Sequence, residues 1–227
     1  MNRRGPYGKT AAKREEILSA ALDLIARHGY RGTSVKAIAE SAGLSPAGVL
    51  HHFGTKERLF VEVLRRRDQL DAARSRADAA ASGTSSLQPL DRYAALLDAN
   101  SGVPGLVELY SALVVEAADP SHEAHGFFTE RRAEAQRLLT RAVRRMQEAG
   151  TLTTRIDAGV LATALHALGD GLQTLWLIDP EVDMGGTITG LLQALRADPS
   201  EADLPDADLP EADRPEPDRT ETGGTPA

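Results

Sequence analysis

Apolar side chains recur every three or four residues through most of this chain, and no segment shows the sustained alternation of apolar and polar residues typical of a half-buried strand. Because this spacing places residues on one face of a helix, the pattern predicts helical structure. Gly and Pro residues divide residues 9–197 into about nine helical segments. The expected fold class is therefore all-α.

Two short segments near the start are predicted to form a helix, a turn and a second helix. The first spans residues 34–42, the turn contains Gly43, and the second spans residues 45–53. Ser45 followed by Pro46 is a strong signal for a helix start. This order is that of a helix-turn-helix motif, whose second helix lies in the major groove of DNA. We therefore predict that residues 34–53 read double-stranded DNA.

The expected DNA surface begins with small side chains at the start of the second helix. They let the backbone approach a phosphate, and the helix N-terminus favours negative charge. Basic side chains around the same surface are predicted to bind phosphates without reading sequence. The set consists of Ser45, Pro46, Ala47, Gly48, Lys36, His51, His52 and Lys56. Since adjacent helical residues point about 100° apart, we expect one of the two histidines to face DNA and the other to face the protein.

The charge of the chain is distributed unevenly. The formal net charge is −7, but residues 1–67 sum to +7, residues 68–197 to −6 and residues 198–227 to −8. A basic N-terminal part indicates an anionic partner. Within residues 1–10, the basic side chains of Arg3, Arg4 and Lys9 predict an arm that enters a neighbouring minor groove.

Residues 198–227 repeat an acidic five-residue unit that contains proline. Proline at this interval prevents a continuous helix, and the high charge predicts a disordered acidic tail. The tail is either a solvated segment that aids solubility or a mimic of nucleic acid that competes for the basic part.

Two segments carry a resemblance to a known family. AALDLIARHGYRGTSVKAIAESAGLS at residues 20–45 and HHFGTKERL at residues 51–59 resemble the DNA-binding domain of the TetR family of transcriptional regulators. The resemblance covers residues 11–71, and residues 72–197 agree with the family's ligand-binding and dimerisation domain in length and helix order.

The resemblance implies a homodimeric regulator, most simply a repressor, whose two recognition helices bind a near-palindromic operator and which a small molecule releases. It implies phosphate contacts by Thr33, Ser34 and Lys56. Ala47 and Leu50 depart from the family's usual glycine and aromatic residue, so the docking mode carries over but base preference does not. A co-repressed or activating regulator of the same fold is the alternative.

The last two predicted helices, residues 157–178 and 184–196, are rich in small and apolar residues. Small residues let helices approach closely, which is consistent with a dimer interface built from two helices of each subunit. The alternative is an intramolecular pair, and the resemblance favours the dimer.

A pocket for a small-molecule effector is expected among the helices between residues 87 and 178. A few polar groups within apolar walls are typical of such a site. The candidate lining residues are Tyr110, Phe127, Phe128, His166, Asp170, Gln173 and Trp176. Each of the polar ones could instead be satisfied within the core or the dimer interface. The fourth helix, from Lys56 to about residue 80, runs from the DNA end into this part and is predicted to link the two.

Other classes of protein explain less of the sequence. Sequence motifs of common enzymes are missing and there is no cysteine, so we expect neither enzymatic activity nor a cofactor. His122 and His125 lie one turn apart on a helix predicted over residues 122–149, but a third metal ligand is not evident, so no metal site is predicted. Without a membrane span or a secretion signal, a cytoplasmic location is expected. A helical interaction module with no DNA role would leave the basic part unexplained.

Overall fold

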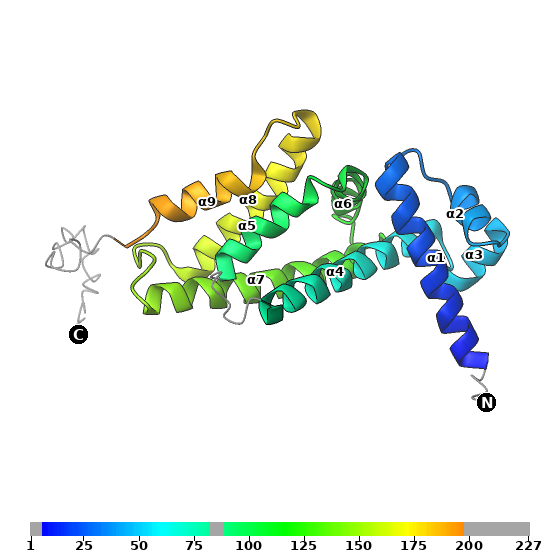
Figure 1. Cartoon of the computed structure of the whole chain (residues 1–227), viewed down its shortest axis with the longest axis horizontal. Helices are drawn as coiled ribbons and strands as arrows, with labels where there is room; N and C mark the ends of the chain where they lie inside the picture. The colour runs from blue at the N-terminus through cyan, green and yellow to red at the C-terminus, as the bar shows by residue number, and fades with distance from the viewer. Residues whose placement is uncertain (1–5, 82–88, 198–227) are drawn as a thin grey trace, which may run out of the picture. The chain divides into compact units, whose positions relative to one another are not determined.

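The computed structural model describes residues 6–81 and 89–197. Arg3, Arg4 and the predicted acidic tail at residues 198–227 lie outside the described residues. Within the described ranges the chain forms nine α-helices and no strand, so the predicted all-α fold is confirmed (Figure 1). The helices are α1 Pro6–His28, α2 Val35–Ser41, α3 Pro46–Phe53, α4 Lys56–Ala81, α5 Pro89–Asn100, α6 Pro104–Glu116, α7 His125–Glu148, α8 Ala158–Ile178 and α9 Met184–Ala194. No helix in these ranges is both long and apolar enough to cross a membrane.

The predicted helix-turn-helix forms as α2 and α3. The hydroxyl oxygen of Ser34 accepts a hydrogen bond from the amide of Ala37 at 3.1 Å, and that of Ser45 accepts one from the amide of Gly48 at the same distance. Both serines thereby satisfy amides that a helix start leaves unpaired. The turn depends on Gly43, whose φ of 65° lies in the left-handed region that favours glycine.

Two helix starts differ from the predictions. α1 begins at Pro6, because proline suits the first position of a helix, so residues 6–10 of the predicted arm are helical. α7 begins at His125 rather than at residue 122. A side-chain turn precedes it, in which Asp119 accepts a hydrogen bond from the amide of Ser121 at 2.8 Å.

Two hydrophobic clusters hold the helices together. The first joins α1–α4 to α6 and the start of α7, and the second joins α5, α8 and α9 to Val107 of α6 and the rest of α7. The predicted domain boundary at residue 71 falls within the continuous helix α4, and the first cluster extends beyond it. The fully buried side chains of the first cluster include Ile17, Ile25, Ile38, Val49, Leu59, Phe60 and Leu109.

Helices α1–α3 contact the rest of the described chain through α4 and α6. Gly105 lies against the backbone of α1, where an added Cβ atom would be 2.0 Å from the carbonyl oxygen of Ile25. Beside this contact, Glu108 accepts a hydrogen bond from the amide of Tyr30 at 3.1 Å and forms an ion pair with Arg31 at 3.1 Å. Figure 1 shows α1–α3 at one end and α5, α8 and α9 toward the other, with α4 and α7 running between them.

Candidate functional site

The recognition helix α3 is anchored by two apolar side chains on its inner face. Val49 and Phe53 are buried. The guanidinium carbon of Arg14 in α1 lies 4.2 Å from the centre of the Phe53 ring, and Arg14 also donates to the carbonyl oxygen of His52. These contacts fix α3 on α1, which leaves its outer face available for a partner.

The start of α3 presents small residues to solvent. Ser45, Pro46 and Ala47 are exposed, whereas Gly48 and Leu50 are partly buried. The capping hydroxyl of Ser45 accepts a bond from the backbone, and the described residues offer no acceptor for its proton. A phosphate oxygen could accept that proton, and α3 directs its N-terminus toward the same place.

Thr33 and Ser34, which the resemblance pairs as phosphate ligands, lie in different surroundings. Thr33 is buried with 5% of its surface exposed, and its hydroxyl donates to the carbonyl oxygen of Gly29 at 2.8 Å. It therefore stabilises the turn after α1, and its expected DNA contact stays a prediction. Ser34 is exposed and keeps its place among the DNA candidates.

The basic candidates differ in how far the protein already neutralises them. Lys36 is exposed and lies 3.9 Å from a carboxylate oxygen of Glu40. Lys56 is exposed, with its ammonium 5.4 Å from the centre of the Phe60 ring. Among the described residues Lys56 has no ion pair, which leaves its charge available for a phosphate. His51 is exposed and His52 partly buried, and which of the two faces DNA stays a prediction.

Acidic residues of the later helices neutralise part of the basic N-terminal segment. Arg31 pairs with Glu108, as described above, and Arg58 pairs with Glu123 at 3.2 Å. Arg65 lies 3.6 Å from Glu130 of α7. The formal charge of +7 in residues 1–67 therefore overstates the positive charge open to DNA.

A pocket of about 330 Å³ lies among α6, α7 and α8. Four of the predicted lining residues are part of it, namely Tyr110, Phe128, His166 and Asp170. The other three predicted residues are not. Phe127 packs in the first hydrophobic cluster, Trp176 packs in the second, and Gln173 is buried beside α5, where it accepts a hydrogen bond from the side-chain amide of Asn100 at 3.2 Å.

A chain of polar contacts crosses this pocket from α4 to α8. Asp68 of α4 accepts two hydrogen bonds from Arg131 of α7, at 3.0 and 3.2 Å. The Arg131 guanidinium lies 4.8 Å from the centre of the Tyr110 ring, and the Tyr110 hydroxyl donates to Asp170 at 3.0 Å. His166 lies 3.7 Å from the other oxygen of Asp170. The pocket is thus connected by side chains to the helix that starts at the DNA end.

Burial and charge set the protonation of this chain of contacts. Burial opposes the charge of Arg131, but the carboxylate of Asp68 outweighs that effect and the pKa of Arg131 lies above its ordinary value. Burial raises the pKa of the Tyr110 hydroxyl, and Asp170 adds to the rise. Arg131 therefore stays charged and Tyr110 stays a hydrogen-bond donor at neutral pH.

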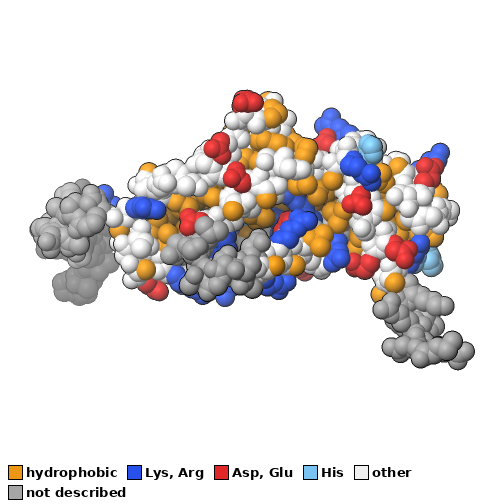
Figure 2. Space-filling view, viewed as in Figure 1, with side chains coloured by type: hydrophobic (Ala, Val, Ile, Leu, Met, Phe, Trp, Pro, Cys, Tyr) orange, Lys and Arg blue, Asp and Glu red, His pale blue; other side chains and the backbone are white. Residues whose placement is uncertain are grey.

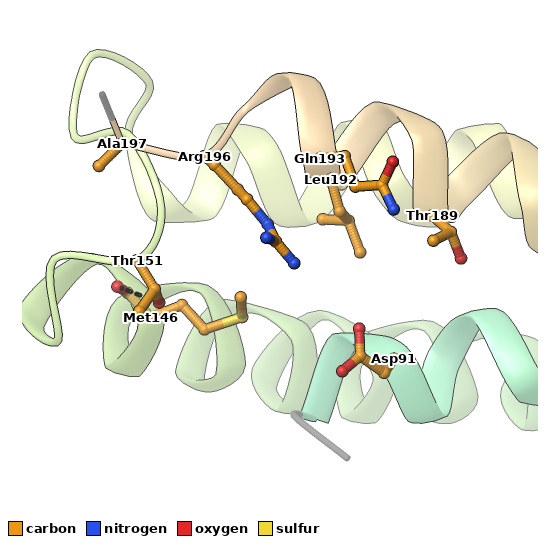
Figure 3. A pocket seen from close by; sticks show the side chains of 8 residues that line it. All are labelled: Asp91, Met146, Thr151, Thr189, Leu192, Gln193, Arg196 and Ala197. Carbon is orange, nitrogen blue, oxygen red and sulfur yellow. Dashed lines mark hydrogen bonds between the residues drawn. The ribbon is translucent and has the colours of Figure 1, made fainter. Parts of the chain in front are cut away.

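A second pocket, of about 370 Å³, lies between the start of α5, the end of α7 and α9. Figure 3 shows Arg196 and Asp91 extending from opposite sides toward the same space. Thr151 lies at the edge, where its hydroxyl donates to the carbonyl oxygen of Met146 at 3.0 Å. The candidate lining residues named from the sequence do not include any residue of this second pocket.

The outer face of α8 and α9 is apolar and uncovered within the described part of the chain. Figure 2 shows hydrophobic side chains on the surface where α8 ends and α9 begins. An added Cβ atom at Gly171 or Gly190 would lie more than 4 Å from every other atom of residues 6–81 and 89–197, apart from the neighbouring residues and backbone of its own helix. The exposed residues at helical spacing are Val160, Ala164, Ala167, Gly171, Leu175 and Ile178 on α8, and Gly186, Gly190 and Ala194 on α9.

The two histidines weighed as a metal pair have other partners. The ring of His122 accepts a hydrogen bond from the amide of Ala124 at 3.2 Å, and a ring nitrogen of His125 lies 2.9 Å from the carbonyl oxygen of Ala117. In residues 6–81 and 89–197, no group of three or more His, Cys, Asp or Glu side chains is placed to hold a metal ion.

Comparison with known proteins places the chain in a family. Residues 17–63 match the model for bacterial regulatory proteins of the tetR family. The HTH-type transcriptional repressor AcnR of Corynebacterium diphtheriae is 31% identical over 163 residues, which cover 70% of this chain and 78% of AcnR. The chain belongs to the TetR family. Its relatives are regulators of transcription rather than enzymes.

Another relative of this TetR-family chain matches over a shorter stretch. The HTH-type transcriptional regulator RutR of Escherichia coli (strain K12) is 47% identical over 55 residues, which span 24% of this chain and only 26% of RutR. The family model matches a similarly short segment, residues 17–63.

Solved structures of TetR-type regulators share the fold along most of the chain. A transcriptional regulator from Saccharomonospora viridis, solved in complex with choline, superposes with a TM-score of 0.66 at 25% identity and covers 83% of this chain and 99% of its own. Reduced NemR of E. coli superposes with a TM-score of 0.62 at 20% identity, covering 83% of this chain and 99% of NemR. The second likeness concerns the fold alone.

Sequence reasoning missed two residues that organise this TetR-family pocket. Arg131 and Asp68 lie on different helices, 63 residues apart. In the sequence, neither can be distinguished from the many charged residues of solvent-exposed helix faces. The available signal was weak: an arginine one helical turn after Phe127 and Phe128, on the edge of the apolar side of α7.

Proposed function

We propose that this TetR-family chain is a ligand-responsive repressor that binds a near-palindromic DNA operator as a homodimer. The observation that carries the proposal is the recognition helix itself. Val49 and Phe53 hold α3 from inside, while Ser45, Pro46 and Ala47 at its start are exposed. This arrangement suits insertion into a major groove, with the phosphates met by the helix N-terminus and Lys56.

A second subunit is the proposed partner of the outer face of α8 and α9. The exposed residues there repeat at helical spacing, and neither Gly171 nor Gly190 is needed for packing within the chain. Such a face can pack against its own copy in a four-helix arrangement. Two copies would present two recognition helices to two half-sites.

The pocket among α6, α7 and α8 is the proposed effector site. The choline complex of the S. viridis regulator supports small-molecule binding in a protein of this fold. Suppose that a ligand binds more tightly to a dimer whose recognition helices are wrongly spaced for DNA. The factor by which DNA weakens binding of that ligand is then the factor by which the ligand weakens binding of DNA. Co-repression or activation by the ligand is the second candidate and follows from the opposite preference.

Binding of the full-length chain to genomic DNA fragments at several salt concentrations tests the proposal. We expect retardation of selected fragments, protection of two half-sites one helical turn or a multiple apart, and an affinity that falls steeply with salt. Replacing Lys56→Gln should flatten the salt slope by about one unit, and Arg141→Gln, on exposed α7, should leave it unchanged. Weak binding to all fragments without protected half-sites would contradict operator recognition.

A further inference from the structure

The chemical class of the effector follows from the charges that line the pocket among α6, α7 and α8. This inference rests on the proposed role of that pocket. Besides Arg131, the lining contains three side chains that can carry positive charge, namely His125, Arg132 and His166. The lining contains one carboxylate, that of Asp170. The balance of charge in the lining is therefore positive.

The carboxylate of Asp170 is already engaged by the protein. One oxygen accepts the Tyr110 hydroxyl proton at 3.0 Å, and the other lies 3.7 Å from His166. Arg131 is engaged as well, through its two hydrogen bonds to Asp68. Arg132 differs from both, because it has no ion pair or hydrogen bond with any residue that the structure describes, and it is exposed at the pocket.

The aromatic wall of the pocket does not favour a cationic ligand. A cation would need an open ring face, but the Arg131 guanidinium already lies 4.8 Å from the centre of the Tyr110 ring. A second positive charge there would be repelled by Arg131 and Arg132. The ring of Phe128, 5.4 Å from that of Tyr110, leaves an apolar surface suited to an uncharged part of a ligand.

We propose that the pocket binds a small organic anion with an apolar body, whose acid group pairs with Arg132 and whose body packs on Phe128. The volume of about 330 Å³ fits a molecule with one acid group and a short chain or single ring. Arg132 is suited to this role because a guanidinium can bind a carboxylate through two parallel hydrogen bonds.

Calorimetry on the full-length chain with matched probes tests this proposal. The probes are 4-phenylbutanoate, its neutral amide 4-phenylbutanamide, and the cation 3-phenylpropyltrimethylammonium. We expect the carboxylate to bind at least about tenfold more tightly than the amide and the cation to bind most weakly. The preference for the carboxylate should disappear in Arg132→Gln and persist in Arg137→Gln, which removes a charge from the same helix away from the pocket.

Equal affinity for acid and amide, tighter binding of the cation, a preference that survives Arg132→Gln, or no binding of the carboxylate at about 10 mM would each overturn the proposal. The proposed function is tested separately by DNA binding of the unliganded protein. A chain that selects the carboxylate but binds no operator would refute the repressor role and leave the anion site in place. A chain that binds its operator but shows no preference for the carboxylate would refute the anion site and leave operator binding in place.

Discussion

Arg131 on α7 and Asp68 on α4 form a two-pronged ion pair, with nitrogen to oxygen distances of 3.0 and 3.2 Å. Asp68 belongs to the helix that begins beside the recognition helix, and Arg131 lines the pocket. Parallel hydrogen bonds between a guanidinium and a carboxylate fix both distance and orientation. The pair therefore holds α4 at a defined position relative to the pocket.

The coupling between these two residues should be measurable. In a double-mutant cycle of Asp68→Asn and Arg131→Gln, monitored by urea unfolding, we expect a coupling free energy of about 1 kcal/mol, since both side chains are only partly shielded from solvent. The Glu134 and Arg137 pair on the surface of α7 is the matched control and should give less than about 0.5 kcal/mol. A coupling free energy no larger than that of the control would show that the Asp68 and Arg131 pair does not connect α4 firmly to the pocket.

The contact between α1 and α6 should not tolerate a side chain. Gly105→Ala would place a Cβ atom 2.0 Å from the carbonyl oxygen of Ile25, so the helices must separate. We expect the free energy of unfolding to fall by about 1–3 kcal/mol. Gly126→Ala on α7, where an added Cβ meets nothing within 4 Å, should leave stability unchanged or slightly raised. Equal stability of the two variants in thermal unfolding would show that the contact can relax.

Ser45 can be used to separate folding from DNA binding. Ser45→Ala removes the cap of α3 and should cost about 1 kcal/mol of stability. Ser45→Asp keeps a capping oxygen but adds a negative charge where a phosphate is expected, so stability should be retained while DNA affinity falls at least about tenfold. Unfolding curves and DNA titrations of both variants provide the measurement. Wild-type DNA affinity in Ser45→Asp would place the phosphates elsewhere.

The face formed by α8 and α9 should accept a large side chain in the monomer but not in a dimer. An added Cβ atom at Gly171 meets no described atom within 4 Å, so we expect Gly171→Arg to give a folded protein that sediments as a monomer at concentrations where the wild type is a dimer. Gly126→Arg, on α7 and equally free of neighbours, should remain dimeric. Sedimentation of Gly171→Arg as a dimer would locate the interface on another surface.

Alkaline pH should reveal the buried tyrosines. Burial raises the pKa of Tyr93 and Tyr110 above the ordinary value of 10.0. Above that pH the unfolded chain releases these protons while the folded chain retains them, so the free energy of unfolding should fall as pH rises. Tyrosinate absorbance should show two of the four tyrosines ionising only as circular dichroism reports unfolding. Ionisation of all four in the folded protein would show that both hydroxyls are accessible.

The sequence predicted local structure better than side-chain function. The helix start at Ser45 and the turn at Gly43 depend on neighbouring residues alone, and the structure confirms them. Thr33 occupies a sequence position that the resemblance assigns to a phosphate ligand. In the structure, tertiary packing buries its side chain. The spacing of apolar residues along the chain does not indicate which polar side chains tertiary packing will bury.

The small residues of α8 show the same limit. Gly169 is small because the hydroxyl oxygen of Tyr93 would lie 2.0 Å from an added Cβ atom, whereas Gly171 faces open space. Of the alternatives weighed from the sequence, packing within the chain therefore applies at Gly169, whereas Gly171, two residues on, stays available for the proposed second subunit. Only the arrangement of α5 against α8 distinguishes them.

The position of Gly105 also determines how far a signal has to travel. Tyr110 in the pocket and Gly105 at the backbone of α1 lie on the same helix, five residues apart, a rise of about 7.5 Å along α6. Since Gly105 has no side chain, α6 and α1 meet backbone to backbone. If the proposed effector displaces α6 as it binds, this contact would carry the displacement to α1 over one short segment of α6.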